Sequence, residues 1–131
     1  MKISVVVCTF NGEKYIIEQL QSIYQQTTMP DEVIIQDDCS TDRTRELIEK
    51  FIRNHNLQNE WTLICNKENM GWKKNFMNAI SKASGDLIFL SDQDDIWYLD
   101  KIEKMAGICI DNPQIELLFS ELKAFNDDND A

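Results

Sequence analysis

The chain has 131 residues and a formal net charge of −10, which is enough length for one domain and one hydrophobic core but not for two. The acidic balance argues against a general nucleic-acid-binding protein, which needs a basic face. No apolar run reaches the roughly 20 residues of a membrane-spanning helix. The amino terminus runs directly into a strand pattern without a cleavage site, and the four cysteines are widely spaced. These features predict an unprocessed protein in a reducing compartment, hence the cytoplasm.

Strand and helix patterns alternate along the chain. Apolar and β-branched runs predict strands at Ile3–Cys8, Val33–Ile35, Trp61–Cys65, Asp86–Ser91 and Ile115–Phe119. Apolar residues at helical spacing predict four intervening helices: Glu13–Gln26, one carrying Leu47 to Ile52, one from Trp72 to Ala83 that Gly85 closes, and one carrying Ile102 to Cys109. This alternation predicts a three-layer α/β/α fold with a mostly parallel central sheet. The domain is expected over residues 1–120, with an acidic tail over 121–131.

The acidic stretch after the fourth predicted strand carries the strongest chemical signal. Residues 88–90 are expected to form a fully buried central strand, and Asp92, Asp94 and Asp95 follow at its carboxyl end, where open α/β sheets bind ligands. Carboxylates this close repel one another unless a cation lies between them, and their hard oxygens suit Mg²⁺ or Mn²⁺. The stretch therefore indicates a metal–diphosphate site. A solvated acidic loop or a helix N-terminus explains the three acids on their own at least as well.

Two further loops, Thr9–Gly12 and Asp37–Asp42, also follow strands and should reach the same edge of the sheet. The chain has neither G-x-G-x-x-G after the first strand nor G-x-x-x-x-G-K-[ST], which disfavours dinucleotide and P-loop sites. Phosphates would then need a metal or basic side chains such as Lys73 and Lys74. Asp38 is suited to accept the imide N–H of a pyrimidine base, although its loop could equally serve to cap the next helix.

Four segments, in order, resemble the motifs of family-2 glycosyltransferases with the GT-A fold. They are Ser4-Val5-Val6-Val7-Cys8-Thr9-Phe10-Asn11-Gly12, Asp37-Asp38-Cys39-Ser40-Thr41-Asp42, Asn69-Met70-Gly71 and Gly85-Asp86-Leu87-Ile88-Phe89-Leu90-Ser91-Asp92-Gln93-Asp94-Asp95-Ile96-Trp97. The resemblance runs from Lys2 to about Phe119. The S-D-Q-D-D-I-W form is most similar to bacterial rhamnosyltransferase-type members.

The resemblance implies a domain that binds a UDP- or dTDP-sugar. The full reaction would pass the sugar, with inversion, to a hydroxyl of a glycan or lipid-linked acceptor in cell-surface polysaccharide synthesis, in the cytoplasm or at the inner face of the membrane. The implied nucleotide-sugar ligands are Thr9, Asn11, Asp37, Asp38, Lys74 and Asp92, and the implied ligands of Mn²⁺ or Mg²⁺ are Asp94 and Asp92.

Individual roles follow from the same resemblance. Thr9 and Asn11 would lie near the base and ribose, and Asp38 would bind the base on a loop that Asp37 supports. Asp92 would lie by the ribose or the metal, and Asp94 would hold the metal on the diphosphate. Asp95 matches a further acid of the family. The assignment of Lys74 to the diphosphate is the weakest fit, because residues 71–75 depart from the commoner spacing.

No catalytic residue is assigned by the sequence. Family members usually continue into an acceptor-binding part with a catalytic acid, and nothing after Phe119 matches it. We therefore expect the chain alone to bind a donor without transferring the sugar. Three other interpretations stay open at this point: a haloacid-dehalogenase-like phosphatase, whose D-x-D supplies nucleophile and acid, a non-catalytic nucleotide-sugar-binding module, and a nucleotidyltransferase.

Overall fold

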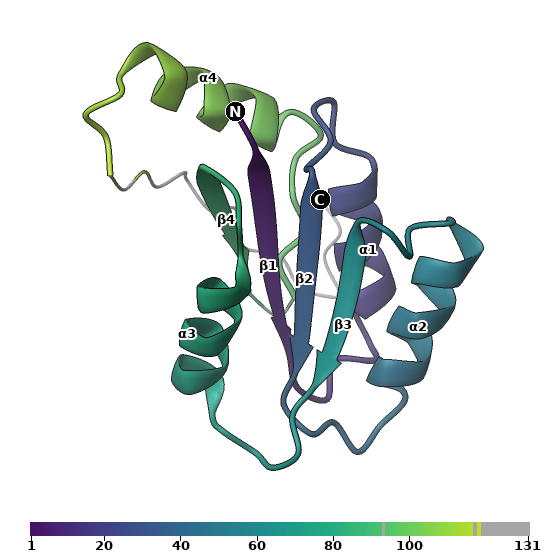
Figure 1. The fold of residues 1–131 in the computed structure, drawn as a ribbon. Helices are drawn as coiled ribbons and strands as arrows, with labels where there is room; N and C mark the ends of the chain where they lie inside the picture. The colour runs from purple at the N-terminus through teal and green to yellow at the C-terminus, as the bar shows by residue number, and fades with distance from the viewer. Residues whose placement is uncertain (93, 117, 119–131) are drawn as a thin grey trace, which may run out of the picture.

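The computed structural model describes residues 1–92, 94–116 and 118. Strands and helices alternate in the order β1 (Ile3–Thr9), α1 (Ile16–Tyr24), β2 (Glu32–Asp37), α2 (Thr44–Asn54), β3 (Trp61–Cys65), α3 (Trp72–Lys82), β4 (Leu87–Ser91) and α4 (Lys101–Asp111). All strand pairs are parallel, in the order β3-β2-β1-β4. Helices α1 and α2 lie on one face of the sheet and α3 on the other (Figure 1). The predicted three-layer α/β/α fold is confirmed.

Strand β1 is buried on both faces, as its unbroken apolar run predicts. Val5 and Val7 belong to the larger core, which β1 and β2 form with α1 and α2. Val6 and Cys8 belong to a smaller core under α3, where they pack with Ala79. Because side chains alternate along a strand, one apolar run serves both layers and places β1 in the middle of the molecule.

Strand β4 differs from its prediction as a fully buried central strand. It lies at the edge of the four-stranded sheet, and only Phe89 of its apolar run is buried. Ile88 and Leu90 are 40% and 49% exposed. They lie on the α3 side, beside Ser4 and Val6 of β1, but α3 packs over β1 and β2 instead. An apolar run shows that a strand can be buried on both faces, but helix placement decides whether it is.

Two other expectations require correction. Gly85 does not close α3 in a left-handed conformation, since α3 ends at Lys82 and Gly71 is the one glycine with positive φ among the described residues. Instead, a Cβ on Gly85 would lie 2.5 Å from Ser4 Oγ, so the glycine allows a close approach to β1. Trp72 begins α3 as predicted but is 76% exposed, outside the core.

The predicted fifth strand, Ile115–Phe119, falls only partly within the described residues. Ile115, Glu116 and Leu118 are not in a strand, and Leu117 and Phe119 lie outside the described residues, as does the expected acidic tail over 121–131. The backbone N–H of Ile115 instead donates to the carbonyl of Asn112 in a turn that follows α4. The described sheet therefore has four strands where the sequence pattern suggested five.

Candidate functional site

Three loops meet at one edge of the sheet, which we call the carboxyl edge because β1, β2, β3 and β4 all end there. Strand β1 pairs with β2 on one side, where Thr9 lies opposite Asp37, and with β4 on the other, where Val7 lies opposite Ser91. Burial raises the pKa of Cys8, near the end of β1, to about 12, and the charges of Asp92 and Asp38 add to the effect. The carboxylates that follow β2 and β4 are therefore both within electrostatic reach of the end of β1.

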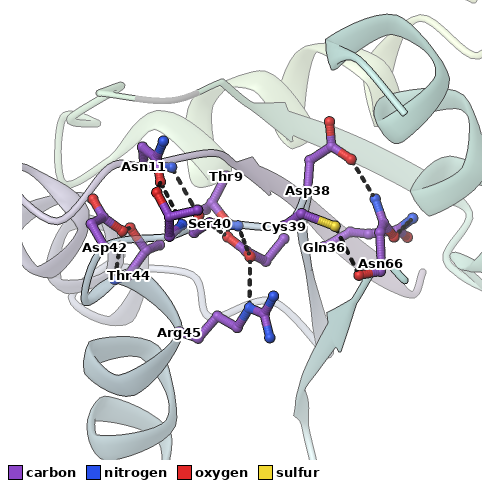
Figure 2. A network of polar contacts seen from close by, with 12 residues as sticks. Thr9, Asn11, Gln36, Asp38, Cys39, Ser40, Asp42, Thr44, Arg45 and Asn66 are labelled. Carbon is purple, nitrogen blue, oxygen red and sulfur yellow. Dashed lines mark hydrogen bonds and ion pairs between the residues drawn. The ribbon is translucent and has the colours of Figure 1, made fainter. Parts of the chain in front are cut away.

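The loop after β1 is bound to the loop after β2 by a series of hydrogen bonds (Figure 2). The backbone N–H of Asn11 donates to Ser40 Oγ at 2.8 Å, and Asn11 Oδ1 accepts from the backbone N–H of Thr41 at 2.8 Å. Asn11 itself has a φ of 48°, a left-handed conformation that asparagine tolerates better than most residues. The N–H of Gly12 donates to Thr44 Oγ1 at 2.8 Å. These bonds make the two loops one rigid unit.

Asp37 is the buried centre of this unit, with no exposed surface. Its carboxylate accepts hydrogen bonds from Thr9 Oγ1 at 2.7 Å, from the N–H and hydroxyl of Ser40, and from Arg45 Nε at 3.1 Å. A buried carboxylate needs such partners because an unpaired one is costly in a core. The Asp37 carboxylate thus holds the end of β1, the loop after β2 and Arg45 together, and its own side chain exposes no surface.

Asp38 points away from Asp37 toward the loop that follows β3. Its Oδ1 accepts from Met70 N–H at 2.7 Å and from the amide of Asn66 at 3.0 Å, and its Oδ2 accepts from Gly71 N–H at 2.9 Å. Burial alone would raise the pKa of Asp38, but the hydrogen bonds from these three donors outweigh it and lower the pKa. Asp38 is therefore held as a carboxylate, and it already accepts hydrogen bonds from two backbone N–H groups of the loop that follows β3.

A network of amides fixes the Asp38 side of the site. Asn66 donates to Asn75 Oδ1 at 2.7 Å as well as to Asp38, and Asn75 donates to the backbone carbonyl of Gln36 at 3.0 Å. Gln36, which is fully buried, donates in turn to Asn66 Oδ1 and Asn78 Oδ1. The network ties α3 to the end of β2. Sequence reasoning missed it, since isolated Asn and Gln residues show no spacing that marks them as partners.

The segment Asp92–Asp95, which we call the acidic turn, follows β4; its Gln93 lies outside the described residues. The N–H of Asp92 donates to Asp95 Oδ2 at 3.0 Å, and the N–H of Asp95 donates to the Asp92 carbonyl at 3.1 Å. Asp94 has a φ of 71° and is exposed. Partial removal from water raises the pKa of Asp94, and the charges of Asp92 and Asp95 raise it further, while Lys14 opposes them.

The residues of the acidic turn fit a hard divalent cation. Burial raises the pKa of Asp95 and the charge of Asp92 adds to this, although a hydrogen bond from the Asp92 backbone and the charge of Lys101 oppose it, so both Asp94 and Asp95 are hindered from ionising. A cation would reverse that effect. Among the described residues no three His, Cys, Asp or Glu side chains gather as a preformed metal cage. Mg²⁺ commonly uses only one or two carboxylates together with substrate phosphates, so two acids such as Asp94 and Asp92 would be enough for it.

Three lysines lie around the site in different settings. Lys14, in the loop after β1, is close enough to Asp94 to lower its pKa. Lys101 lies 4.8 Å from the centre of the Trp97 ring, and its burial lowers its pKa, which Asp95 partly restores. Lys74 lies on the first turn of α3 with its side chain exposed. The sequence analysis singled out Lys74, whereas the structure places Lys14 nearer the acidic turn.

Two surface hollows among the described residues lie away from this edge. One of about 210 Å³ lies between α1 and α2, and one of about 360 Å³ lies along α2 and β3. Neither is lined by a residue of the three loops. The assignment of the site therefore rests on the chemistry and hydrogen bonding of its side chains.

Comparison with known proteins agrees with this geometry. Residues 4–119 match glycosyl transferase family 2. The chain belongs to this family. It is 36% identical over 129 residues to the poly(ribitol-phosphate) β-N-acetylglucosaminyltransferase TarS of Staphylococcus aureus, and 38% identical over 109 residues to the dTDP-rhamnosyl transferase RfbG of Shigella flexneri. These matches cover 96% and 81% of this chain but only 22% and 37% of the two relatives.

Solved structures of the family share the fold. The crystal structure of TarS with UDP-GlcNAc superposes with a TM-score of 0.71 at 33% identity, over 86% of this chain and 32% of that one. The mannosyltransferase PcManGT of Pyrobaculum calidifontis, solved with GDP-Man and Mn²⁺, gives 0.77 at 27% identity, over 85% and 33%. Because the chain belongs to this glycosyltransferase family, we no longer consider the interpretation as a haloacid-dehalogenase-like phosphatase.

In the described part of the chain, no helix is both long and apolar enough to cross a membrane.

Proposed function

We propose that this chain is the donor-binding part of a metal-dependent, inverting glycosyltransferase that uses a UDP- or dTDP-sugar. The observation that carries the proposal is the position of Asp38 and the acidic turn on either side of the end of β1. Asp38, with a lowered pKa, and Asp94 and Asp95, with raised pKa values, thus lie at the same edge. Nucleotide and metal would bind across that edge, with the diphosphate between them.

At the metal end, Asp94 and Asp92 would hold Mn²⁺ or Mg²⁺. The cation, when bound, supplies positive charge that stabilises the departing diphosphate. Support comes from the mutual repulsion within the acidic turn and from PcManGT, which was solved with GDP-Man and Mn²⁺. Lys14 is better placed than Lys74 to share the neutralisation of the diphosphate.

At the base end, Asp38 would accept the imide N–H of uracil or thymine. Each carboxylate oxygen offers about two acceptor positions. Oδ1 receives two donors, and Oδ2 receives one from the described residues, so Oδ2 keeps a position for the base. Thr9 and Asn11 shape the neighbouring wall, where the ribose would lie. TarS, solved with UDP and with UDP-GlcNAc, supports a uridine donor.

The acceptor and the pathway follow only by analogy. The named relatives act on poly(ribitol-phosphate) or transfer rhamnose from dTDP-rhamnose. We infer a glycan or lipid-linked acceptor and a role in cell-surface polysaccharide synthesis, in the cytoplasm or at the inner face of the membrane. The catalytic base would come from outside the residues matched here to family motifs.

A thermal-shift screen tests the donor and the metal together. The chain would be melted with UDP, UDP-GlcNAc, dTDP-rhamnose or GDP-mannose, each with Mn²⁺ or with EDTA. A ligand at 100 times its dissociation constant stabilises the folded state by about 2.7 kcal/mol, so we expect a clear rise with UDP or dTDP-rhamnose in Mn²⁺ only. Equal shifts in Mn²⁺ and EDTA would refute metal dependence.

Asp38→Asn tests the base contact. The variant keeps one oxygen for Asn66 and Met70 but presents N–H groups where Gly71 and the base need an acceptor. One lost buried hydrogen bond costs about 1–3 kcal/mol, so UDP should bind more weakly while inorganic diphosphate with Mn²⁺ is unaffected. Calorimetry on both ligands gives the comparison. Equal weakening of the two would reduce Asp38 to a structural cap.

A further inference from the structure

Helix α1 carries a row of polar side chains on its buried face. Gln19, Ser22 and Gln26, the last just past the helix end, are only 1%, 6% and 4% exposed. Their spacings of three and four residues place them along one side of the helix. Buried polar groups destabilise a fold unless they are hydrogen-bonded, so each of the three must have a partner on a neighbouring element.

The row binds the segment that leaves β4. The amide of Gln19 donates to the backbone carbonyl of Asp92 at 2.6 Å and to Ser91 Oγ at 2.9 Å. Gln26 does the same further along, donating to the Tyr98 carbonyl at 2.6 Å and accepting from the N–H of Ile102 at 2.9 Å.

Gln19 is the member of the row that reaches the acidic turn. The Asp92 carbonyl that it binds also accepts from the N–H of Asp95. One backbone oxygen therefore joins α1, the end of β4 and the far side of the turn. The N–H of Asp92 donates to Asp95 Oδ2 as well, so the turn is anchored through the backbone of Asp92. Gln19 supplies that anchor from a different element.

We propose that Gln19 is a positioning residue for the metal-binding turn. Its amide fixes the backbone carbonyl of Asp92, next to the Asp92 carboxylate and two residues before Asp94, without touching metal or nucleotide. Sites of this kind need their ligands held within about 0.5 Å, and loss of a supporting residue typically costs about 10- to 100-fold in metal affinity. The inference rests on the proposed function, because it takes Asp92 and Asp94 as the residues that carry the cation.

Gln19→Met and Gln26→Met form a matched pair. Both replace a buried glutamine of the same row with a side chain of similar shape that cannot donate. Only Gln19 holds the acidic turn, whereas Gln26 holds Tyr98 and Ile102. Calorimetry of Mn²⁺ binding in saturating UDP, with melting curves as a check of folding, should show about tenfold weaker Mn²⁺ binding in Gln19→Met. Gln26→Met should lose similar stability yet keep the parent's Mn²⁺ affinity.

A second substitution protects the test against misfolding. Gln19→Asn keeps an amide that is one methylene too short to reach the Asp92 carbonyl, and it should weaken Mn²⁺ binding in the same direction. A folded Gln19 variant that binds Mn²⁺ as tightly as the parent would overturn the inference. Equal losses of Mn²⁺ affinity in Gln19→Met and Gln26→Met would overturn it as well. A parent chain that binds UDP equally well with and without Mn²⁺ would overturn the metal site itself, and this inference with it.

Discussion

The carboxylates of the carboxyl edge are held in opposite electrostatic states. Burial works against ionisation of Asp38, but three hydrogen-bond donors lower its pKa overall. For Asp94, by contrast, burial and the charges of Asp92 and Asp95 raise the pKa, and only the charge of Lys14 opposes them. The difference is physical, because donors that point at a carboxylate favour its charge whereas like charges oppose it. Asp38 is thus ready for a neutral N–H group, and the acidic turn is ready for a cation.

Asp94→Asn should remove the repulsion within the acidic turn and also the proposed metal ligand, so it should affect stability and Mn²⁺ affinity in opposite directions. A carboxyl whose pKa is raised on folding adds stability below the ordinary aspartate range, and that stability is lost as pH rises through the folded pKa. At pH about 7 the substitution should therefore raise the melting temperature of the metal-free chain, and near pH 3 the gain should vanish, because aspartate is then largely protonated in both states. Asparagine also tolerates the left-handed backbone at this position.

The same variant should bind Mn²⁺ poorly. Because Asp94 is proposed as a direct ligand, replacing its carboxylate should weaken Mn²⁺ binding by more than the roughly tenfold expected for a supporting residue. Calorimetry in saturating UDP measures the affinity, and differential scanning calorimetry at the two pH values measures stability. A variant that is less stable than the parent at neutral pH would contradict the repulsion, and one that binds Mn²⁺ as well as the parent would contradict the ligand role.

At the scale of elements, the junction between α3 and β4 depends on one close approach. A Cβ on Gly85 would lie 2.5 Å from Ser4 Oγ and 2.7 Å from the backbone nitrogen of Ser4, a residue of β1 that lies opposite Glu32 of β2. The N–H of Gly85 also donates to Ser4 Oγ at 2.8 Å. The hydroxyl could move, but the backbone of β1 cannot, since β1 is the middle of the molecule.

Gly85→Ala should therefore destabilise the fold by about 1–3 kcal/mol, the usual cost of overpacking. Gly107→Ala is its control, because Gly107 lies within α4 and a Cβ there meets nothing within 4 Å. Alanine in a helix interior should stabilise by about 0.5–1 kcal/mol. Urea denaturation of both variants gives the two free energies of unfolding. Equal effects in the two variants would show that the contact with Ser4 is unimportant.

At the scale of the whole molecule, the net charge of −10 opposes compactness. Raising ionic strength from about 10 mM to about 150 mM shortens the screening length from roughly 30 Å to roughly 8 Å. We expect the melting temperature to rise by a few degrees in NaCl over this range. MgCl₂ at the same ionic strength should raise it further, because we propose that the acidic turn binds a divalent cation. A melting temperature that falls or stays constant in NaCl would show that self-repulsion contributes little.

Much of the fold could be read from local patterns. The four described strands and helices all lie where periodicity predicts them, and the alternation alone gave a parallel sheet whose loops share an edge. The pairs that build the site could not be read in this way. Arg45 with Asp37, and Gln19 with Asp92, are 8 and 73 residues apart. One feature of the sequence does mark Gln19: it is a polar residue on the apolar face of its helix, between Ile16 and Ile23, which indicates a buried side chain with a hydrogen-bond partner.

The sequence by itself determined the layer order, the sheet edge at which chemistry is concentrated, and the resemblance that the family match confirms. These depend on residue type and on spacing along the chain, which are local quantities. Only the tertiary structure decided that Ile88 and Leu90 are exposed, that Gly85 is needed for contact with β1, and that Gln19 supports the acidic turn. Each of these depends on which distant element lies alongside, and burial and hydrogen bonding are properties of that neighbour as much as of the residue.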